Sequence, residues 1–316
     1  PTFTDSVLTL GYLNPGHLVG GDLQLDANRA RQVLENAIAK PIERDLLDAA
    51  WGIFQVACGT MVRAVKAVST YRGRDPRDFT LFAFGGNGPV VAAEIANLLD
   101  MSEVVVPPTP GVFSAFGLLL SDVEHEISRA WLHRLADAGP ADMENAYATL
   151  KKELCEVMAD EGYGQSDYSI TRYADLRYAG QAHELTIETT SAGGAPDLAA
   201  LALEFGAEHE RTYGHKAEAE AVECVTLRLI ARVAEDRPAR KDATSGGGDR
   251  KADPRQAYFG PVYGQMETPV IDRAELTNPV TGPVIVEEYD STCIVPPGWK
   301  VALDMQNNIV MTRGNT

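Results

Sequence analysis

The feature that most constrains the fold is an apolar run that ends abruptly at a glycine-rich turn. The run covers residues 79–84 and is followed directly by Gly85, Gly86, Asn87, Gly88 and Pro89. Residues 90–99 then carry apolar side chains at helical spacing, and residues 104–106 form a second apolar run. This order predicts a buried strand, a turn, a helix and a second buried strand, which is typical of α/β folds.

The glycine turn (residues 85–89) has physical properties that suit a ligand. Glycine takes positive φ and has no side chain, so a ligand can lie directly against the main chain. Pro89 suits the first position of a helix, where its missing N–H is not needed. The free N–H groups and the dipole of the helix start favour an anion or a polar ring edge. A tight turn that binds no ligand also explains these residues, because they match neither common phosphate-binding pattern.

Composition and charge exclude several classes of function. The chain has 316 residues, a formal net charge of −17 and a pI near 4.8. Nucleic acid binding needs a basic surface, so we expect no nucleic acid partner. No run of about 18 apolar residues is present, which predicts no membrane span. The start of the chain lacks the pattern of a secretory signal and the four cysteines are scattered, so we expect a cytoplasmic protein.

The titratable residues suggest one cluster and no metal site. Histidine and cysteine spacing matches none of the usual ligand patterns, so we expect no metal site formed by this chain alone. One segment is dense in titratable groups and contains Asp122, Glu124, His125 and Glu126. A carboxylate–histidine pair could act as general acid and base. A polar strand with alternating faces explains the same residues, so both interpretations stay open.

The remaining periodicity predicts alternating helices and strands. Residues 1–25 are rich in turn formers and predict an extended lead-in. Asp26 is a good N-cap for a helix that ends near Lys40, and residues 45–71 predict a longer helix. Further along, the pattern predicts helices at residues 139–161 and 198–213, a strand at 222–233, a mobile loop at 235–256 and strands in the tail.

Five segments resemble motifs of the A-type subunits of the hydantoinase/oxoprolinase family. They are PTFTDSVLTLGYLNP (1–15), FAFGGNGP (82–89), VVVPPTPGVFSAFGLLLSDVEHE (104–126), DLRYAGQAHEL (175–185) and GPVIVEEYDSTCIVPPGW (282–299). The family includes 5-oxoprolinases, ATP-hydrolysing N-methylhydantoinases, and related subunits of acetone and acetophenone carboxylases. The chain departs from the family pattern at Val90 and Val91, where many members carry Leu and His. Any role of that histidine is therefore lost here.

The resemblance implies an α/β fold with part of an actin/hexokinase-like ATPase domain followed by a β-rich α+β domain. The expected division is the C-terminal half of the ATPase domain at residues 1–135, a helical connector at 136–165 and the β-rich domain at 166–316. In that fold, an Asp-Gly-Gly-Thr type loop of the first half holds the phosphates and Mg²⁺. No such segment is present. We therefore expect that the N-terminal half of the A subunit is missing and that the isolated chain is inactive.

The implied function is that of an ATP-dependent cyclic amidase, which phosphorylates the substrate amide before the ring opens. ATP and Mg²⁺ are the implied cofactors, a small molecule is the substrate, and a hydantoinase B-type subunit or domain is the partner in a hetero-oligomer. The nucleotide contact would be made by Gly85, Gly86, Asn87, Gly88 and Pro89. Thr4 and Asp5 match the family's Thr-Asp near the cleft and are the candidate catalytic residues, although a cap role explains Asp5 equally well.

Two other functions stay open. The chain could belong to an ATP-dependent ketone carboxylase of the acetone or acetophenone type, because those subunits share the same motifs. It could also be a non-catalytic structural fragment of such a complex, because the phosphate loop is absent and the chain is acidic. Nucleotide binding would favour the enzymes over the structural fragment.

Overall fold

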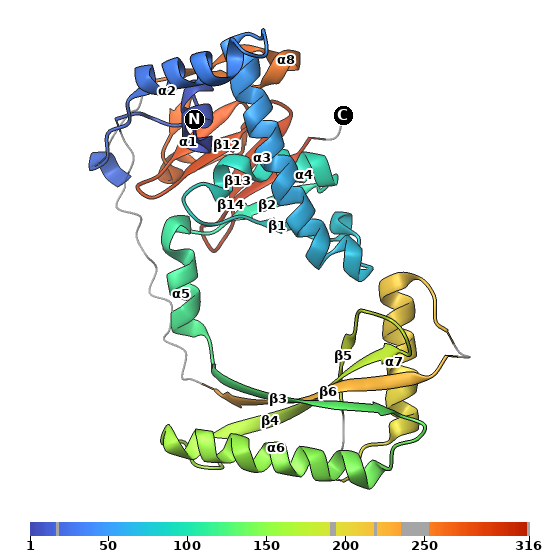
Figure 1. Ribbon diagram of the computed structural model, residues 1–316. Coiled ribbons are helices and arrows are strands. Elements are labelled where there is room, and N and C mark those ends of the chain that lie inside the picture. Colours follow the sequence, from blue (N-terminus) through green and yellow to red (C-terminus); the bar gives the residue numbers. More distant parts are fainter. Residues whose placement is uncertain (17–18, 190–193, 218–219, 235–252, 315–316) are drawn as a thin grey trace. The chain divides into compact units, whose positions relative to one another are not determined.

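The protein is described by a computed structural model that covers residues 1–16, 19–189, 194–217, 220–234 and 253–314. The chain divides into two compact units (Figure 1). Unit 1 comprises residues 1–70, 75–118 and 240–316, and unit 2 comprises residues 71–74 and 119–239. Both units combine helices with sheets, which confirms the expected mixed α/β class. Their bounds differ from the three expected segments, whose limits at residues 135 and 165 stay a prediction.

Unit 1 is built on a five-stranded sheet that joins the middle of the chain to its last strands. The order is β1-β2-β14-β13-β10, and within this sheet only the pair β1 and β2 is parallel. The bounds are Leu81–Phe82 (β1), Glu103–Val106 (β2), Ile309–Arg313 (β14), Trp299–Leu303 (β13) and Val280–Thr281 (β10). A three-stranded sheet and a hairpin add Val270–Ile271 (β9), Val284–Glu287 (β11), Thr292–Val295 (β12), Arg255–Tyr258 (β7) and Gln265–Thr268 (β8).

Helices α1 to α4 of unit 1 share one hydrophobic core with its strands, whereas α5 and α8 contribute no residue to it. Their bounds are Phe3–Thr9 (α1), Ala27–Leu34 (α2), Leu46–Val68 (α3), Gly88–Leu99 (α4), Phe113–Leu120 (α5, whose last two residues belong to unit 2) and Gly260–Tyr263 (α8). The Asp26 carboxylate accepts a hydrogen bond from the Arg29 main-chain N–H, so the predicted N-cap is confirmed. The predicted long helix is α3, and it contributes Ala50 and Phe54 to the core.

The first residues form a helix, so the extended lead-in expected there is wrong. Thr2 is the N-cap of α1, and its hydroxyl accepts a hydrogen bond from the Asp5 N–H. The Asp5 carboxylate accepts in turn from the Thr2 N–H at 2.6 Å. This capping box satisfies donors that a helix start leaves unpaired. The helix also buries Val7 and Leu8 in the core, and the turn formers begin only at Gly11, after it ends.

The apolar run before the glycine turn is not the buried strand that its sequence suggests. β1 has two residues and lies at the edge of the sheet, with β2 as its neighbour. Phe79, Phe82 and Phe84 are 50%, 45% and 43% exposed. An apolar run does not reveal whether both faces of a strand are covered, and here one face is open. The second predicted strand, β2, is confirmed and buries Val104 and Val106 fully.

Unit 2 is a four-stranded antiparallel sheet with two helices that share its core. The strand order is β3-β6-β4-β5. The bounds are Val123–Arg134 (β3), Pro140–Asp160 (α6), Tyr168–Tyr178 (β4), Leu185–Glu188 (β5), Leu198–Tyr213 (α7) and Val222–Val233 (β6). α6 falls in the expected connector, yet it buries Met143, Leu150 and Met158 against this sheet. It is therefore part of the core of unit 2.

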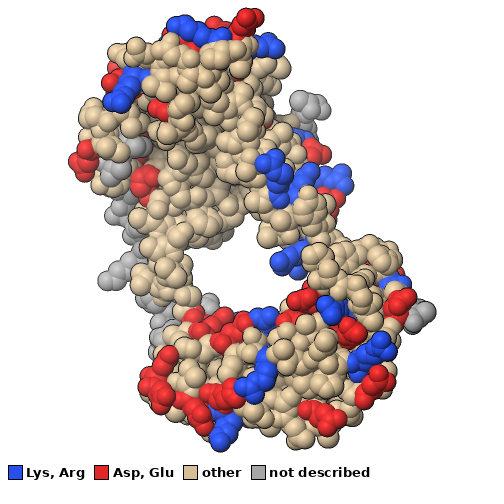
Figure 2. Space-filling view, viewed as in Figure 1, with Lys and Arg blue, Asp and Glu red and all other residues tan. Residues whose placement is uncertain are grey.

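Charged side chains gather on unit 2, as the face in Figure 2 shows. The titratable cluster of residues 122–126 lies at the start of β3, with Asp122 just before the strand, and pairs with neighbouring elements. Glu124 and Glu126 form ion pairs with Arg232 and Arg228 of β6. His125 Nε2 lies 2.7 Å from Glu161 Oε2. Glu124 and Glu126 thus lie on one face of β3, and His125 lies on the other.

The structure also bears on two expectations about segments of the chain, one about membrane spans and one about the loop at residues 235–256. None of the described helices is long and apolar enough to cross a membrane. The mobile loop expected at residues 235–256 lies outside the described residues except at its end, where Arg255 begins β7.

Candidate functional site

The glycine turn lies where the two parallel strands of unit 1 end. β1 leads into the turn, and β2 leads into a second loop at residues 107–112. The carboxyl ends of neighbouring parallel strands are the usual place for ligands in α/β sheets. The Gly85 N–H donates a hydrogen bond to the Pro110 carbonyl at 2.7 Å, which joins the two loops. Gly85 has a φ of +81°, a conformation that favours glycine.

A third segment, residues 288–291 between β11 and β12, completes this loop cluster. The Gly111 N–H donates to Asp290 Oδ2 at 2.9 Å. The Ser291 hydroxyl donates to the Gly86 carbonyl at 3.5 Å. A Cβ on Gly111 would lie 2.7 Å from Asp290 Oδ2, closer than real Cβ contacts allow. The three loops therefore approach each other so closely that position 111 requires glycine.

The surface of the turn is open. A Cβ built on Gly85 would meet no atom within 4 Å, and one on Gly86 would meet only the Asp290 carbonyl at 3.6 Å. Asn87 is exposed and is the N-cap of α4, but its side chain does not cap the helix. Among the described residues the Asn87 amide has no hydrogen-bond partner. Its donor and acceptor are therefore available to a ligand.

A buried arginine, which sequence reasoning missed, supports the loop cluster from behind. Arg273 is 1% exposed and donates two hydrogen bonds to the Glu288 carboxylate, at 2.6 and 2.9 Å. It also donates to the main-chain carbonyls of Pro107 at 2.8 Å and Asn307 at 2.6 Å. Burial raises the pKa of Glu288, while its bonds to Arg273 oppose the rise. Arg273 thus ties the second loop to the third, and no motif in the sequence signals this.

Thr4 and Asp5 lie in the first turn of α1. The Asp5 carboxylate accepts hydrogen bonds from the N–H and the hydroxyl of Thr2, at 2.6 and 2.9 Å. Within the described part of the chain, no hydrogen bond or ion pair links Thr4 or Asp5 to the glycine turn. The capping box explains Asp5 fully, and a catalytic role for these two residues stays a prediction.

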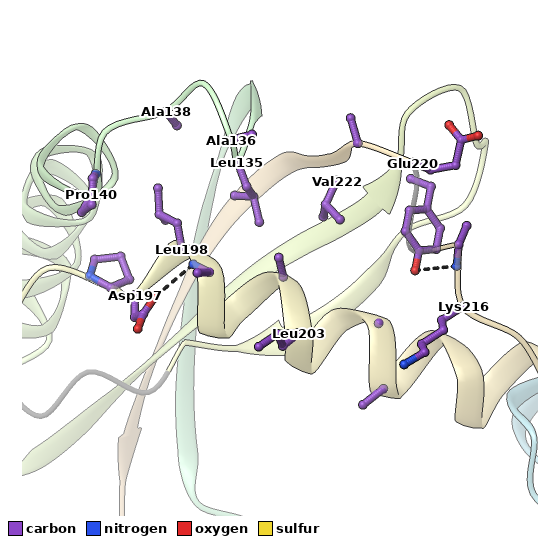
Figure 3. A pocket seen from close by; sticks show the side chains of 18 of the residues that line it. Leu135, Ala136, Ala138, Pro140, Asp197, Leu198, Leu203, Lys216, Glu220 and Val222 are labelled. Carbon is purple, nitrogen blue, oxygen red and sulfur yellow. Dashed lines mark hydrogen bonds between the residues drawn. The ribbon is translucent and has the colours of Figure 1, made fainter.

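A large cavity belongs to unit 2 and shares no residue with the expected site. It measures about 1160 Å³ and lies along α7, with Leu135, Leu198 and Val222 among the side chains that line it (Figure 3). Its lining is mostly apolar, and Asp197 is occupied as the N-cap of α7. No residue of the glycine turn lines it. Across the described residues, no three His, Cys, Asp or Glu side chains gather as a metal site would require.

Comparison with known proteins identifies the family. The model of the hydantoinase/oxoprolinase family matches residues 1–127, and the model of the hydantoinase/oxoprolinase C-terminal domain matches residues 134–312. Caprolactamase subunit alpha of Pseudomonas jessenii is 31% identical over the whole chain and 47% of its own length. Acetone carboxylase beta subunit of Xanthobacter autotrophicus is 26% identical over 96% of this chain and 44% of its own length.

A solved structure agrees with these matches. The crystal structure of the ATP-dependent caprolactamase from Pseudomonas jessenii superposes with a TM-score of 0.82 at 29% identity. The superposition covers the whole of this chain and 47% of that one. The chain thus spans about half the length of the curated relatives it matches. Two family models together cover nearly every residue, and the chain belongs to the hydantoinase/oxoprolinase family.

Proposed function

We propose that this chain supplies part of an ATP-dependent enzyme that opens a cyclic amide. The observation that carries the proposal is the family match over the full chain together with an open glycine turn at the ends of two parallel strands. Relatives named as caprolactamase support a lactam or a related ring as the substrate. The relatives are about twice as long, so the remaining half of the A subunit would come from polypeptide outside this sequence.

The reaction uses ATP to phosphorylate the amide oxygen, which makes that oxygen a better leaving group. The amide oxygen attacks the γ-phosphorus, a new P–O bond forms, and the bond to the departing ADP breaks. Water then adds to the activated carbon and the C–N bond of the ring breaks, which leaves an acyl phosphate. A second water hydrolyses this acyl phosphate and releases inorganic phosphate and the ring-opened acid. Mg²⁺ at nucleotide sites is usually held by one or two carboxylates together with the phosphates, and the proposal assigns it no ligand in this chain.

In this proposal the glycine turn contacts the base-and-sugar end of ATP. Gly85 and Gly86 let the ligand approach the main chain, and the Asn87 amide supplies a donor and an acceptor for the adenine or the ribose. Gly88 and Pro89 start α4 and orient its first turn towards the same place. Thr4 and Asp5 are kept as candidate catalytic residues, since the A subunit could close around them when it is complete.

The names of the same relatives support a partner subunit. The names caprolactamase subunit alpha and acetone carboxylase beta subunit indicate multi-subunit enzymes. We therefore include a hydantoinase B-type subunit as the partner in a hetero-oligomer, and a cytoplasmic location, in the proposal. The carboxylase relative keeps a second function open, in which ATP activates a ketone rather than an amide.

Nucleotide binding tests the proposal directly. Isothermal titration of the chain with ATP and ADP should give a binding signal that Gly86→Val abolishes. The substitution has room for its Cβ, so it fills the space of the ligand without straining the fold. Gly52→Val is the matched control, because position 52 on α3 is exposed and a Cβ there meets no atom within 4 Å.

Three outcomes decide between the candidates. Loss of binding in Gly86→Val alone supports the nucleotide contact. Equal binding by Gly86→Val and the parent chain refutes the contact at the turn. Absence of any nucleotide binding, together with tight association with a B-type subunit, favours the structural role over the enzyme. Hydrolysis of lactams and carboxylation of ketones by the complete complex then separate the two enzyme functions.

A further inference from the structure

A second cavity lies wholly in unit 1 and shares no residue with the glycine turn. It measures about 480 Å³ and opens between α3, α4, α8 and the segment that joins β12 to β13. Six aromatic residues line it, which are Tyr12, Trp51, Phe54, Phe259, Tyr263 and Trp299. A cavity of this size suits a small ligand, and the density of rings in its walls is its main chemical property.

The aromatic walls are held in place by their neighbours. Trp51 stacks on Phe54 with ring centroids 5.1 Å apart, and Tyr12 meets Phe54 edge-on at 5.6 Å. The main chain of Gly260 lies directly against Trp51, since a Cβ there would come within 2.8 Å of the indole ring. Trp299 Nε1 donates to Asn97 Oδ1 at 3.2 Å. The rings are therefore arranged before any ligand arrives.

One carboxylate faces this aromatic cavity with an unused oxygen. Glu94 of α4 lines the cavity and is half-buried. Its Oε1 accepts a hydrogen bond from Gln55 Nε2 at 2.7 Å. Within the described part of the chain its second oxygen has no hydrogen-bond partner and Glu94 forms no ion pair. Burial raises the pKa of Cys58 to about 12, and the nearby charge of Glu94 adds to that rise.

The other charged residue of the lining is already neutralised. Arg313 contributes to the cavity, but its guanidinium lies 2.6 Å from the Asp100 carboxylate. The remaining polar side chains of the lining, Gln55 and Asn97, are uncharged. The cavity therefore presents one uncompensated negative charge to a space walled by rings. A cation placed beside this carboxylate would be attracted by its charge.

We propose that this cavity binds a small organic cation, with its ammonium group against the Glu94 carboxylate and its alkyl groups against Trp51 and Tyr263, the two aromatic residues of the lining that are not buried. Ring faces attract cations through their quadrupole, and a quaternary or primary ammonium group combines charge with apolar surface. The net charge of −17 favours the approach of a cation to the chain. The proposal does not depend on the nucleotide contact, because the two sites share no lining residue.

Tryptophan fluorescence can measure this binding. The chain has three tryptophans, of which Trp51 and Trp299 line the cavity and Trp131 lies on β3 of unit 2. A Trp131→Phe background therefore makes the emission report on the cavity. The probe is choline, and its comparator is 3,3-dimethylbutan-1-ol, which has the same shape without the charge. Choline should change the emission saturably and should bind at least about tenfold more tightly than the alcohol.

Variants assign the charge effect to Glu94. Glu94→Gln keeps the shape of the side chain and an acceptor for Gln55, and it should weaken choline about 10- to 100-fold without changing the affinity for the alcohol. Glu35→Gln is the matched control, because Glu35 is a surface residue paired with Lys40 and should leave binding unchanged. Circular dichroism verifies that each variant folds. Equal affinity for choline and the alcohol, unchanged choline binding by Glu94→Gln, or no saturable response to choline would each overturn the proposal.

Discussion

Removal of the Arg273 side chain should destabilise unit 1 strongly. Arg273→Met keeps much of the length and apolar character of the side chain but removes the guanidinium. The Glu288 carboxylate then loses two hydrogen bonds and its counter-charge, and the carbonyls of Pro107 and Asn307 lose a donor. Breaking one partner of a buried pair leaves an uncompensated charge and costs about 3–5 kcal/mol. We therefore expect the free energy of unfolding to fall by about that amount.

The loss should depend on pH with a defined sign. Burial already raises the pKa of Glu288, and Arg273 opposes the rise. A carboxyl with a higher pKa in the folded state stabilises the fold below its unfolded pKa and loses that contribution as the pH rises through its folded pKa. Without Arg273 the folded pKa rises further. The destabilisation by Arg273→Met should therefore be smaller near pH 5 and larger near pH 7.

Urea unfolding followed by the emission of Trp51 and Trp299, both in unit 1, measures this effect. Trp299 lies on β13 in the sheet of unit 1, and a Trp131→Phe background removes the signal of unit 2. The control combines Glu288→Gln with Arg273→Met in the same background, because Glu288→Gln removes the carboxylate charge that Arg273→Met leaves unpaired. The double variant should be more stable than Arg273→Met alone. A loss below about 1 kcal/mol near pH 7, or a loss that does not change with pH, would refute the electrostatic argument.

Three further predictions follow from single contacts. Gly111→Ala should lower the stability of unit 1 by about 1–3 kcal/mol, because the added Cβ would collide with Asp290. Gly117→Ala is the control and should be neutral or stabilising, because a Cβ there meets no atom within 4 Å. Thermal unfolding compares the stability of the two variants. Thr2→Ala should destabilise the chain by about 0.5–2 kcal/mol through loss of the α1 cap, and an unchanged melting temperature would contradict the capping box. Burial raises the thiol pKa to about 12 in three of the four cysteines, which are Cys58, Cys224 and Cys293. A thiol reagent near pH 8 should therefore label Cys155 first. Rapid labelling of all four cysteines in the folded chain would contradict the burial.

Local signals in the sequence predicted part of the fold correctly. Asp26 as an N-cap, the long helix α3 and the buried strand β2 each depend on neighbouring residues, so a short window contains enough information. The capping box of Thr2 and Asp5 was also visible in principle. A cap role for Asp5 was considered, but the helix α1 was missed because the turn formers from Gly11 onwards dominate the same stretch. The exposure of Phe82 could not be predicted, because it depends on which strands flank β1.

The candidate site depends on contacts between residues far apart in the sequence, more than the correctly predicted helices and strands do. The glycine turn was predicted from its own residues, yet its partners Pro110 and Ser291 come from loops far along the chain. Arg273 and Glu288 are ordinary charged residues in the sequence, and only their burial identifies them as a support. Glu94 likewise resembles a solvated helix residue until the aromatic lining around it is known. Spacing in sequence carries no information on such contacts, because they follow from the folded backbone.

The position of β14 has a consequence for synthesis on the ribosome. β14 lies between β2 and β13, so the sheet of unit 1 stays divided until residues 309–313 have been translated. Unit 2 is almost continuous in sequence and can fold while the rest of the chain is still being made. During that interval the first helices of unit 1 and its strands β1 and β2 cannot pair or pack with β13 and β14. The apolar surface of these elements therefore lacks its final partner strand until β14 has been made.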